Sequence, residues 1–274
     1  MTPPRLVVAG CPRGGTSLFA KLLVAAGLST VRDVRASEKY PSGYYEHVPL
    51  LMFHKAMERF PRARSHHRSD YVATTDPFLH TAYLDDPFVR SLFETAFAPL
   101  TAREVAFLKY PQLALSADAL FDALGDDLRL VLVWRDPVPS VVSMSRKEFG
   151  RDTWPFRGLR SVLLWCTYAH HVVQAKERHG DRVAVVHIDR VVDGTCAIDR
   201  VLAPLGVEVP PTPADRVMDP GVWTRGASAS DRARVAVLDR LAAGAARRLG
   251  ADPALTGLDR WATRLAAVTG PCTS

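Results

Sequence analysis

The segment GCPRGGTS, near the start of the chain, combines the residue types that are needed to bind an anion. Gly14 and Gly15 permit a close backbone approach, and a helix that begins at Thr16 points its free N–H groups and its positive dipole end at the ligand. Thr16 and Ser17 supply hydroxyl donors, and Arg13 supplies a guanidinium fork. The segment therefore predicts an anion-binding turn, although a purely structural glycine turn would have the same composition. A nucleoside-triphosphate P-loop is not indicated, because no Lys stands before the hydroxyl.

A second arginine, Arg135, follows the apolar run LVLVW and precedes Asp136. Ligands of open α/β sheets bind at the carboxyl ends of the strands, which is where we expect Arg135. Ser143 stands on the expected following helix, so Arg135 and Ser143 could grip a phosphate from two sides. The competing interpretation is a surface Arg135 that pairs with Asp136.

Strands and helices alternate along the chain. Continuous apolar runs predict buried strands at residues 5–10, 105–108, 130–134 and 183–188. Apolar residues at helical spacing predict helices at residues 16–26, 116–124, 138–149 and 158–179. Strands that are apolar throughout and alternate with helices indicate an α/β fold with a central parallel sheet covered on both faces.

No repeat, low-complexity tract or clear break in composition divides the chain, so we expect a single domain over residues 1–274. Helical insertions are expected at about residues 46–100 and 151–179, and further helices at about residues 230–267. Many of the aromatic residues fall in or beside these insertions. Most of them should be ordinary core, and the alternative is an apolar ligand pocket above the sheet.

The charge balance favours an anionic ligand. Lys and Arg number 35 against 29 Asp and Glu, which gives a net charge of +6, and only six of the basic residues are Lys. Arg is suited to planar, bidentate binding of phosphate or sulfate. A nucleic-acid-binding protein is not indicated, because no basic stripe is interleaved with aromatic residues. No apolar run reaches the roughly 18 residues of a membrane span.

The four cysteines, Cys11, Cys166, Cys196 and Cys272, lie far apart in the chain. Their spacing predicts neither a metal site nor a disulfide framework, which favours a reducing compartment and a cytoplasmic location.

The longer segment GCPRGGTSLFAKLL resembles the 5′-phosphosulfate loop of sulfotransferases that use 3′-phosphoadenosine-5′-phosphosulfate (PAPS). The bacterial and tyrosyl-protein branches of that family read G-x-P-R-S-G-T. The chain departs from this pattern at Gly14, where Ser is usual, and so lacks one hydroxyl donor. It carries Arg13 where the cytosolic branches have Lys.

Further segments are similar to other motifs of that family. RDP at residues 135–137, followed by Ser143, is similar to the 3′-phosphate motif R-[DN]-P-x5-S. Weaker similarities are those of Lys109 to the K-[DT]-P segment, of Glu46 to a bacterial G-[YF]-x-E segment and of Arg225 to a late I-D-P…R segment. The resemblance spans about residues 5–226.

The resemblance implies a P-loop-like α/β architecture and sulfuryl transfer from PAPS to a hydroxyl group of a small-molecule acceptor, with no metal. Arg13 and Lys109 would be catalytic, and Arg13 would stabilise the charge that grows on the leaving oxygen. The donor-binding residues that the resemblance implies are Pro12, Arg13, Gly14, Gly15, Thr16, Ser17, Arg135, Ser143 and Arg225.

The general base for the acceptor is less clearly indicated, because cytosolic members of the family have a His where this chain has Pro111. By analogy with other branches, Glu46 is the leading catalytic candidate and His47 and His54 are reserves, but Glu46 could equally be a favourable charge at a helix N-terminus. A P-loop kinase is the alternative enzyme. It would need a Walker Lys, which is absent, and a Mg²⁺-binding Asp, for which Asp189 is a loose candidate. A catalytically inert nucleotide-binding relative and the oligomeric state also stay open.

Overall fold

The computed structural model describes residues 4–31, 45–57, 59–60, 75–147, 156–217, 227–245 and 252–270. Within them, four parallel strands form a sheet in the order β2-β1-β3-β4. The strands are β1 (Arg5–Gly10), β2 (Phe107–Lys109), β3 (Leu128–Trp134) and β4 (Val183–His187). This sheet, flanked by helices, confirms the predicted α/β class.

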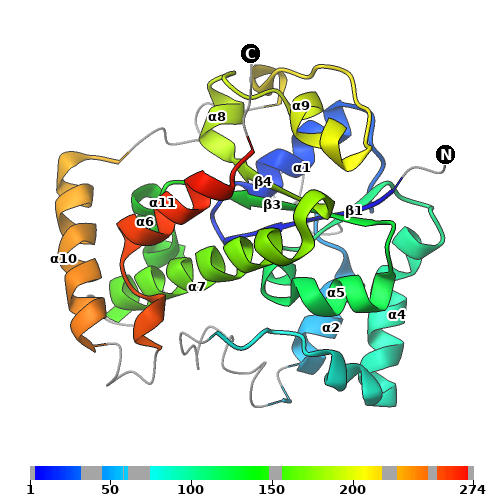
Figure 1. The fold of residues 1–274 in the computed structure, drawn as a ribbon, viewed down its shortest axis with the longest axis horizontal. Helices are drawn as coiled ribbons and strands as arrows, with labels where there is room; N and C mark the ends of the chain where they lie inside the picture. The colour runs from blue at the N-terminus through cyan, green and yellow to red at the C-terminus, as the bar shows by residue number, and fades with distance from the viewer. Residues whose placement is uncertain are drawn as a thin grey trace.

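Helices cover both faces of the sheet. The described α-helices are α1 (Thr16–Ala25), α2 (Val48–Met57), α4 (Pro87–Thr101), α5 (Ala117–Leu124), α6 (Pro137–Lys147), α7 (Phe156–His179), α8 (Ile188–Val192), α9 (Ile198–Leu202), α10 (Ala229–Ala245) and α11 (Leu258–Val268). Short 3₁₀ helices are η1 (Thr81–Asp85), η2 (Pro111–Ser116), η3 (Gly180–Arg182), η4 (Ala203–Leu205), η5 (Ala214–Arg216) and η7 (Pro253–Leu255). Figure 1 shows α1, α8 and α9 on one side of the sheet and α2, α4, α5 and α7 on the other.

The apolar strands explain this layering, because their alternate side chains enter two separate cores. Leu6 and Val8 of β1 pack with α1, α8 and α9, whereas Val7 and Ala9 pack with the helices of the opposite face. All four side chains are buried. A strand buried on both faces reads as a continuous apolar run, which is why its position could be predicted from sequence.

The described part of the predicted second insertion, α7, belongs to the layer that covers the sheet. Trp165 and Tyr168 on this helix are almost fully buried and join the same core as the strands, as do Phe53, Phe93 and Phe97 of the first insertion. The prediction that most aromatic residues are core therefore holds for these five.

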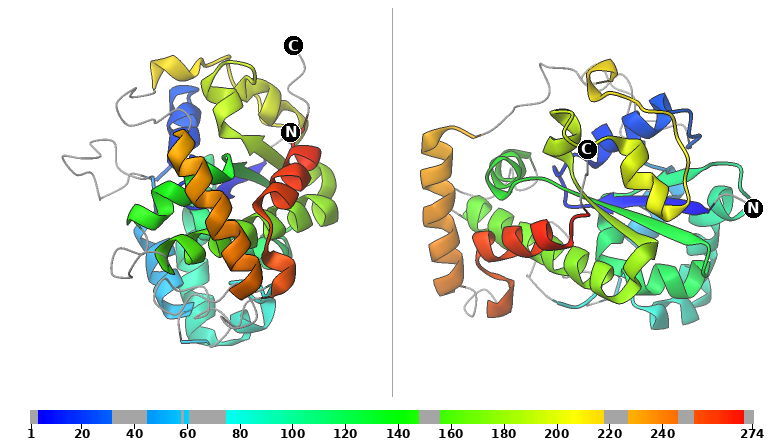
Figure 2. Two further views of the ribbon diagram at one scale, coloured as in Figure 1. Left: turned by 90° about the vertical axis from the view of Figure 1, so that its left-hand side faces the viewer. Right: turned by 45° about the horizontal axis from the view of Figure 1, so that its top comes forward.

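The helix α10 packs against α6 and α7 at one end of the protein. In the left view of Figure 2 it crosses the surface that faces the viewer. A Cβ atom added at Gly158 of α7 would lie 2.4 Å from Leu238 Cδ1 of α10. The glycine therefore allows α10 to approach the start of α7 closely.

Three predicted strands differ in their bounds. The strand predicted at residues 130–134 begins earlier, at Leu128. The strand predicted at residues 105–108 runs from Phe107 to Lys109, and the Ala106 and Phe107 N–H groups both donate to the Ser29 carbonyl. Lys109 pairs in register with Val8 although it is charged. The last strand ends at His187, since Ile188 begins α8.

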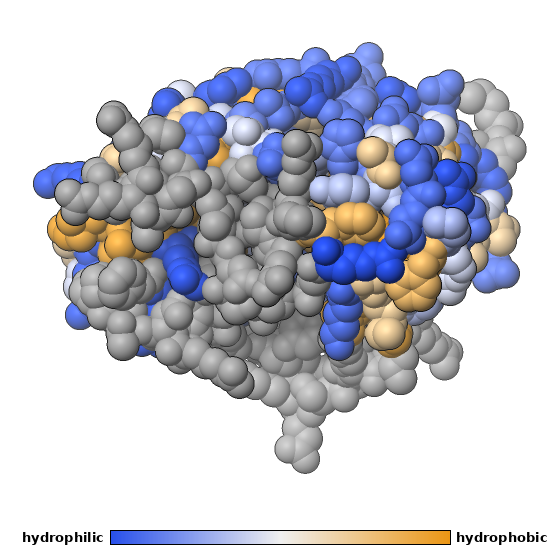
Figure 3. Space-filling view, turned by 90° about the horizontal axis from the view of Figure 1, so that it is seen from below, coloured by the Kyte–Doolittle hydropathy of each residue, from blue (hydrophilic) through white to orange (hydrophobic). Residues whose placement is uncertain are grey.

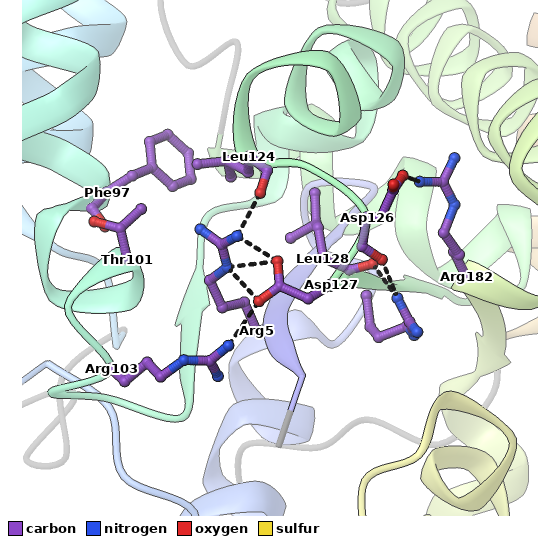
Figure 4. A network of polar contacts seen from close by, with 10 residues as sticks. Arg5, Phe97, Thr101, Arg103, Leu124, Asp126, Asp127, Leu128 and Arg182 are labelled. Atoms are coloured by element: carbon purple, nitrogen blue, oxygen red, sulfur yellow. Dashed lines mark hydrogen bonds and ion pairs between the residues drawn. The ribbon is translucent and has the colours of Figure 1, made fainter. Parts of the chain in front are cut away.

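The amino ends of the strands are joined by ion pairs, shown in Figure 4. The Arg5 Nε donates to Asp127 at 2.9 Å and 3.0 Å, and Arg103 donates to the same carboxylate at 2.7 Å. The hydrogen bond from Arg5 holds the pKa of Asp127 below its ordinary value. Arg182 pairs with Asp126 close by. These arginines therefore hold strands and loops together at the edge opposite the candidate site.

The cysteine prediction is wrong at one position, because Cys196 is disulfide-bonded, whereas Cys11 and Cys166 are buried thiols outside any disulfide. Cys196 therefore gives no support for a reducing compartment, and a cytoplasmic location stays a prediction. None of the helices in the described ranges is both long enough and apolar enough to cross a membrane.

Candidate functional site

Polar side chains gather where the four parallel strands end. Arg13 lies in the loop after β1, Lys109 is the last residue of β2, and Arg135 follows β3 directly. His187 ends β4 and Asp189 follows it on α8. Because the carboxyl ends of parallel strands meet at one edge of a sheet, residues far apart in sequence come together here.

The loop after β1 is a tight turn that leads into α1. The Gly14 N–H donates to the Cys11 carbonyl at 2.8 Å, and Arg13 adopts φ 63, in the left-handed region. The helix starts at Thr16, and no side chain among the described residues caps it. The first N–H groups of a helix have no partner within it, so this end offers backbone donors and a positive dipole to an anion.

The glycines of this loop are required by the protein itself. A Cβ atom at Gly14 would lie 2.7 Å from the Cys11 carbonyl oxygen, and one at Gly15 would lie 2.7 Å from Ile188 Cγ1. Gly15 also has φ 93, which side chains disfavour. From sequence, these glycines were expected to let a ligand approach the backbone closely. The structure shows that they also allow the loop to pack closely, Gly15 against α8.

Arg13 and Ser143 meet although 130 positions separate them. The Arg13 Nε donates to the Ser143 Oγ at 3.0 Å. Ser143 lies on α6, the helix that follows β3, and both side chains are partly buried. The structure therefore brings the glycine-rich loop and the RDP segment into direct contact.

Glu46 pairs with Lys109 across the end of β2. The Lys109 Nζ donates to the Glu46 Oε1 at 2.8 Å, with Lys109 1% and Glu46 23% exposed. Tyr45 has φ 57 and packs against the core on the α1 side, whereas Phe53 of α2 packs on the opposite face. The chain therefore turns at Tyr45 and carries Glu46 over the edge of the sheet. Burial lowers the pKa of the adjacent His47.

Arg135 makes an ion pair with Asp189, whereas one interpretation of the sequence had placed it with Asp136. Its Nε lies 3.3 Å and 3.4 Å from the two carboxylate oxygens of Asp189, and its side chain is 6% exposed. Asp136 instead lies 3.1 Å from the His187 Nε2, and that hydrogen bond lowers the pKa of Asp136. The Trp165 Nε1 donates to the Arg135 carbonyl at 3.3 Å. Arg135 is therefore held at both its backbone and its side chain.

Asp136, His187 and Asp189 offer ligand atoms that lie within 4.8 Å of one another. No metal was predicted from sequence, and that stays a prediction. The three groups already have partners, since His187 contacts Asp136 and Asp189 contacts Arg135.

The remaining sequence candidates differ in where they lie and in whether the structure describes them. Arg225 lies outside the described residues, as does the tyrosine-rich stretch before Tyr45. His54 stacks on Phe78, with ring centroids 4.8 Å apart. Pro12 lies in the loop, partly buried.

Sequence reasoning missed the partnership of Asp189 with Arg135. A usable signal was present, because Arg135 and Asp189 each follow a buried strand by one or two residues. If those strands are neighbours, their following residues lie at one edge.

Comparison with known proteins places the chain in a family. Two solved structures are similar to it: the "Sulfotransferase Domain from the Synechococcus PCC 7002 Olefin Synthase" and the "Sulfotransferase Domain from the Curacin Biosynthetic Pathway". The first is 13% identical, with a TM-score of 0.44, and the match covers 86% of this chain and 95% of that domain. The second is 14% identical, with a TM-score of 0.45, and the match covers 78% of this chain and 76% of that domain. No curated protein matches the sequence.

The family model described as "Sulfotransferase family" matches residues 4–211, which is most of the chain. That range includes β1 to β4, the glycine-rich loop, Glu46, Lys109, Arg135 and Ser143. The chain therefore belongs to the sulfotransferase family.

Proposed function

We propose that this protein transfers a sulfuryl group from PAPS to a hydroxyl group of a small-molecule acceptor. The contact between Arg13 and Ser143 carries the proposal, because it joins the expected 5′-phosphosulfate loop to the expected 3′-phosphate motif. A donor with phosphates at both ends of one ribose needs two anion sites a short distance apart. Arg13 and Arg135 supply the cations of these two sites, at the ends of the neighbouring strands β1 and β3.

The residues present fit such a donor. The uncapped start of α1 would hold the 5′ end through backbone N–H groups and the hydroxyls of Thr16 and Ser17. Arg135 and Ser143 would hold the 3′-phosphate. Thr16 and Arg135 are both almost fully buried, so the charge would be bound where water competes little.

The chemistry is an in-line displacement at sulfur. A bond forms between sulfur and the acceptor oxygen, the bond from sulfur to the bridging phosphate oxygen breaks, and the acceptor proton goes to Glu46. Arg13 stabilises the charge that grows on the bridging oxygen, because a fixed cation there binds the transition state better than the ground state. Lys109 holds the Glu46 carboxylate, to which it donates at 2.8 Å.

The surface near Glu46 favours an acceptor with apolar character. Val48 and Met52 lie one turn apart on α2, just after Glu46, and are 38% and 50% exposed. Figure 3, seen from below, shows apolar and hydrophilic residues side by side on the part of the surface that α2 and α4 form. An amphiphilic hydroxyl compound fits such a surface.

Calorimetric titration with 3′,5′-adenosine bisphosphate, ADP and Mg-ATP tests the donor. Binding that prefers the bisphosphate, needs no Mg²⁺ and is lost in Arg135→Ala would support the proposal. Arg129→Ala is the matched control, since Arg129 lies on the same strand but bonds backbone carbonyls at the opposite edge. Preference for Mg-ATP would instead support the kinase alternative.

A further inference from the structure

Asp189 makes an ion pair with Arg135 that the proposed chemistry does not by itself require. The carboxylate lies beside the Arg135 Nε, and it is 28% exposed while Arg135 is nearly buried. From sequence alone, Asp189 was a loose candidate for a magnesium ligand. Its partner in the structure is a guanidinium group.

The geometry of the pair bears on how Arg135 can bind an anion. Arg has five N–H donors, one on Nε and four on the two terminal nitrogens, all in one plane. A carboxylate beside Nε orients this plane and does not itself use the terminal donors. The two terminal nitrogens also present a parallel pair of N–H groups, which can form a two-pronged contact with a phosphate.

Asp189 is also tied to the other half of the site. It lies on α8 next to Ile188, whose side chain occupies the space that a Cβ atom of Gly15 would need. The short helix α8 therefore contacts the glycine-rich loop through Ile188 and Arg135 through Asp189. One element sets the position of both expected anion sites.

We propose that Asp189 is a positioning residue that orients the Arg135 guanidinium for the 3′-phosphate and so makes the site selective for a 3′-phosphorylated nucleotide. This inference rests on the proposed function. Asp189 does not contact the donor in this proposal, and it acts through Arg135.

The direction in which anion affinity changes when Asp189 is removed distinguishes a positioning role from a purely electrostatic one. Removing a negative charge close to an anion site strengthens anion binding if only the net charge matters. If Asp189 orients Arg135, removing it weakens binding of the 3′-phosphate despite the more positive site. Binding of a nucleotide that has no 3′-phosphate should change little.

The test measures binding of 3′,5′-adenosine bisphosphate and of 5′-AMP by calorimetry, at one ionic strength. We expect Asp189→Ala to weaken bisphosphate binding by about tenfold or more, the scale of one lost charge-assisted hydrogen bond, and to change 5′-AMP binding by less than about twofold. Asp189→Asn keeps an oxygen that accepts from Nε, so we expect it to restore most of the lost affinity. Asp193→Asn is the control, since it removes the same charge at the end of the same helix, where the carboxylate bonds Thr195.

Three results would overturn the inference: unchanged or tighter bisphosphate binding in Asp189→Ala, an equal loss for both nucleotides, or an equal loss in Asp193→Asn. Thermal unfolding of each variant shows whether it is folded, and Asp189→Ser, whose side chain is too short to accept from the Arg135 Nε, serves as the test variant if Asp189→Ala is not. A loss of tenfold or more in Asp189→Ser that spares 5′-AMP would then support the inference. If the wild type itself does not prefer the bisphosphate to 5′-AMP, the proposed donor is wrong and this inference falls with it. A selective wild type with an unaffected Asp189→Ala would overturn the inference alone.

Discussion

The contact between Gly15 and Ile188 allows the packing of the glycine-rich loop to be measured. In Gly15→Ala, the new methyl group would lie 2.7 Å from Ile188 Cγ1 and 2.9 Å from Cγ2, at a residue with φ 93. Gly27 is a matched control, because it has φ 94 and nothing lies within 4 Å of its added Cβ atom. The two substitutions therefore place Ala at nearly the same positive φ and differ in the steric clash.

The expected magnitudes follow from these two terms. An Ala in the left-handed region costs about 1–2 kcal/mol, so Gly27→Ala should lower the free energy of unfolding by that amount. Overpacking of a core contact costs about 1–3 kcal/mol more. Gly15→Ala should therefore lower the free energy of unfolding by about 2–5 kcal/mol.

Urea unfolding of the two variants, followed by circular dichroism, measures the difference, provided that the slopes with urea agree. A double-mutant cycle with Ile188→Ala tests whether this difference comes from the contact with Ile188. That change removes both γ carbons and should reduce the cost of Gly15→Ala by about 1–2 kcal/mol. A difference between Gly15→Ala and Gly27→Ala of less than about 0.5 kcal/mol would refute the close packing of the loop on α8.

Two further predictions concern catalysis and pH. Glu46→Gln keeps the shape of the side chain but cannot accept a proton, so turnover with any acceptor that the wild type sulfates should fall by about 10²–10⁴-fold, while calorimetric bisphosphate binding stays within about twofold. Unchanged turnover would exclude Glu46 as the base. Asp239 accepts a hydrogen bond from the Leu258 N–H at 3.2 Å, and burial raises its pKa above the ordinary 3.8. Because the native state holds this proton more tightly, stability falls as the pH rises from the ordinary value through the raised pKa. Asp239→Asn should therefore raise Tm at about pH 7 and leave it unchanged at about pH 3. A lower Tm at the higher pH would contradict this reasoning.

The elements that could be predicted are those with a local cause. The apolar run of β1, the glycine turn and the apolar spacing of α1 are properties of neighbouring residues, and each lies within a residue of its expected place. The position of Arg135 after β3 follows in the same way.

The error at β2 has a tertiary cause. The predicted strand ended at Leu108, where the continuous apolar run stops, and a Lys is ordinarily exposed. Lys109 is instead 1% exposed, with Glu46 as its partner, and continues the strand. A distant carboxylate, which no local pattern reveals, makes that burial possible.

The sequence by itself therefore determined the α/β class, the glycine turn between β1 and α1 and the family to which the chain is similar. Only the tertiary structure decided the pairings at the sheet edge: Arg13 with Ser143, Lys109 with Glu46 and Arg135 with Asp189. Each joins residues that are 54 or more positions apart. Such partners depend on the strand order and on which side chains lie at the same buried edge. Neither can be predicted from the apolar periodicity of a single segment.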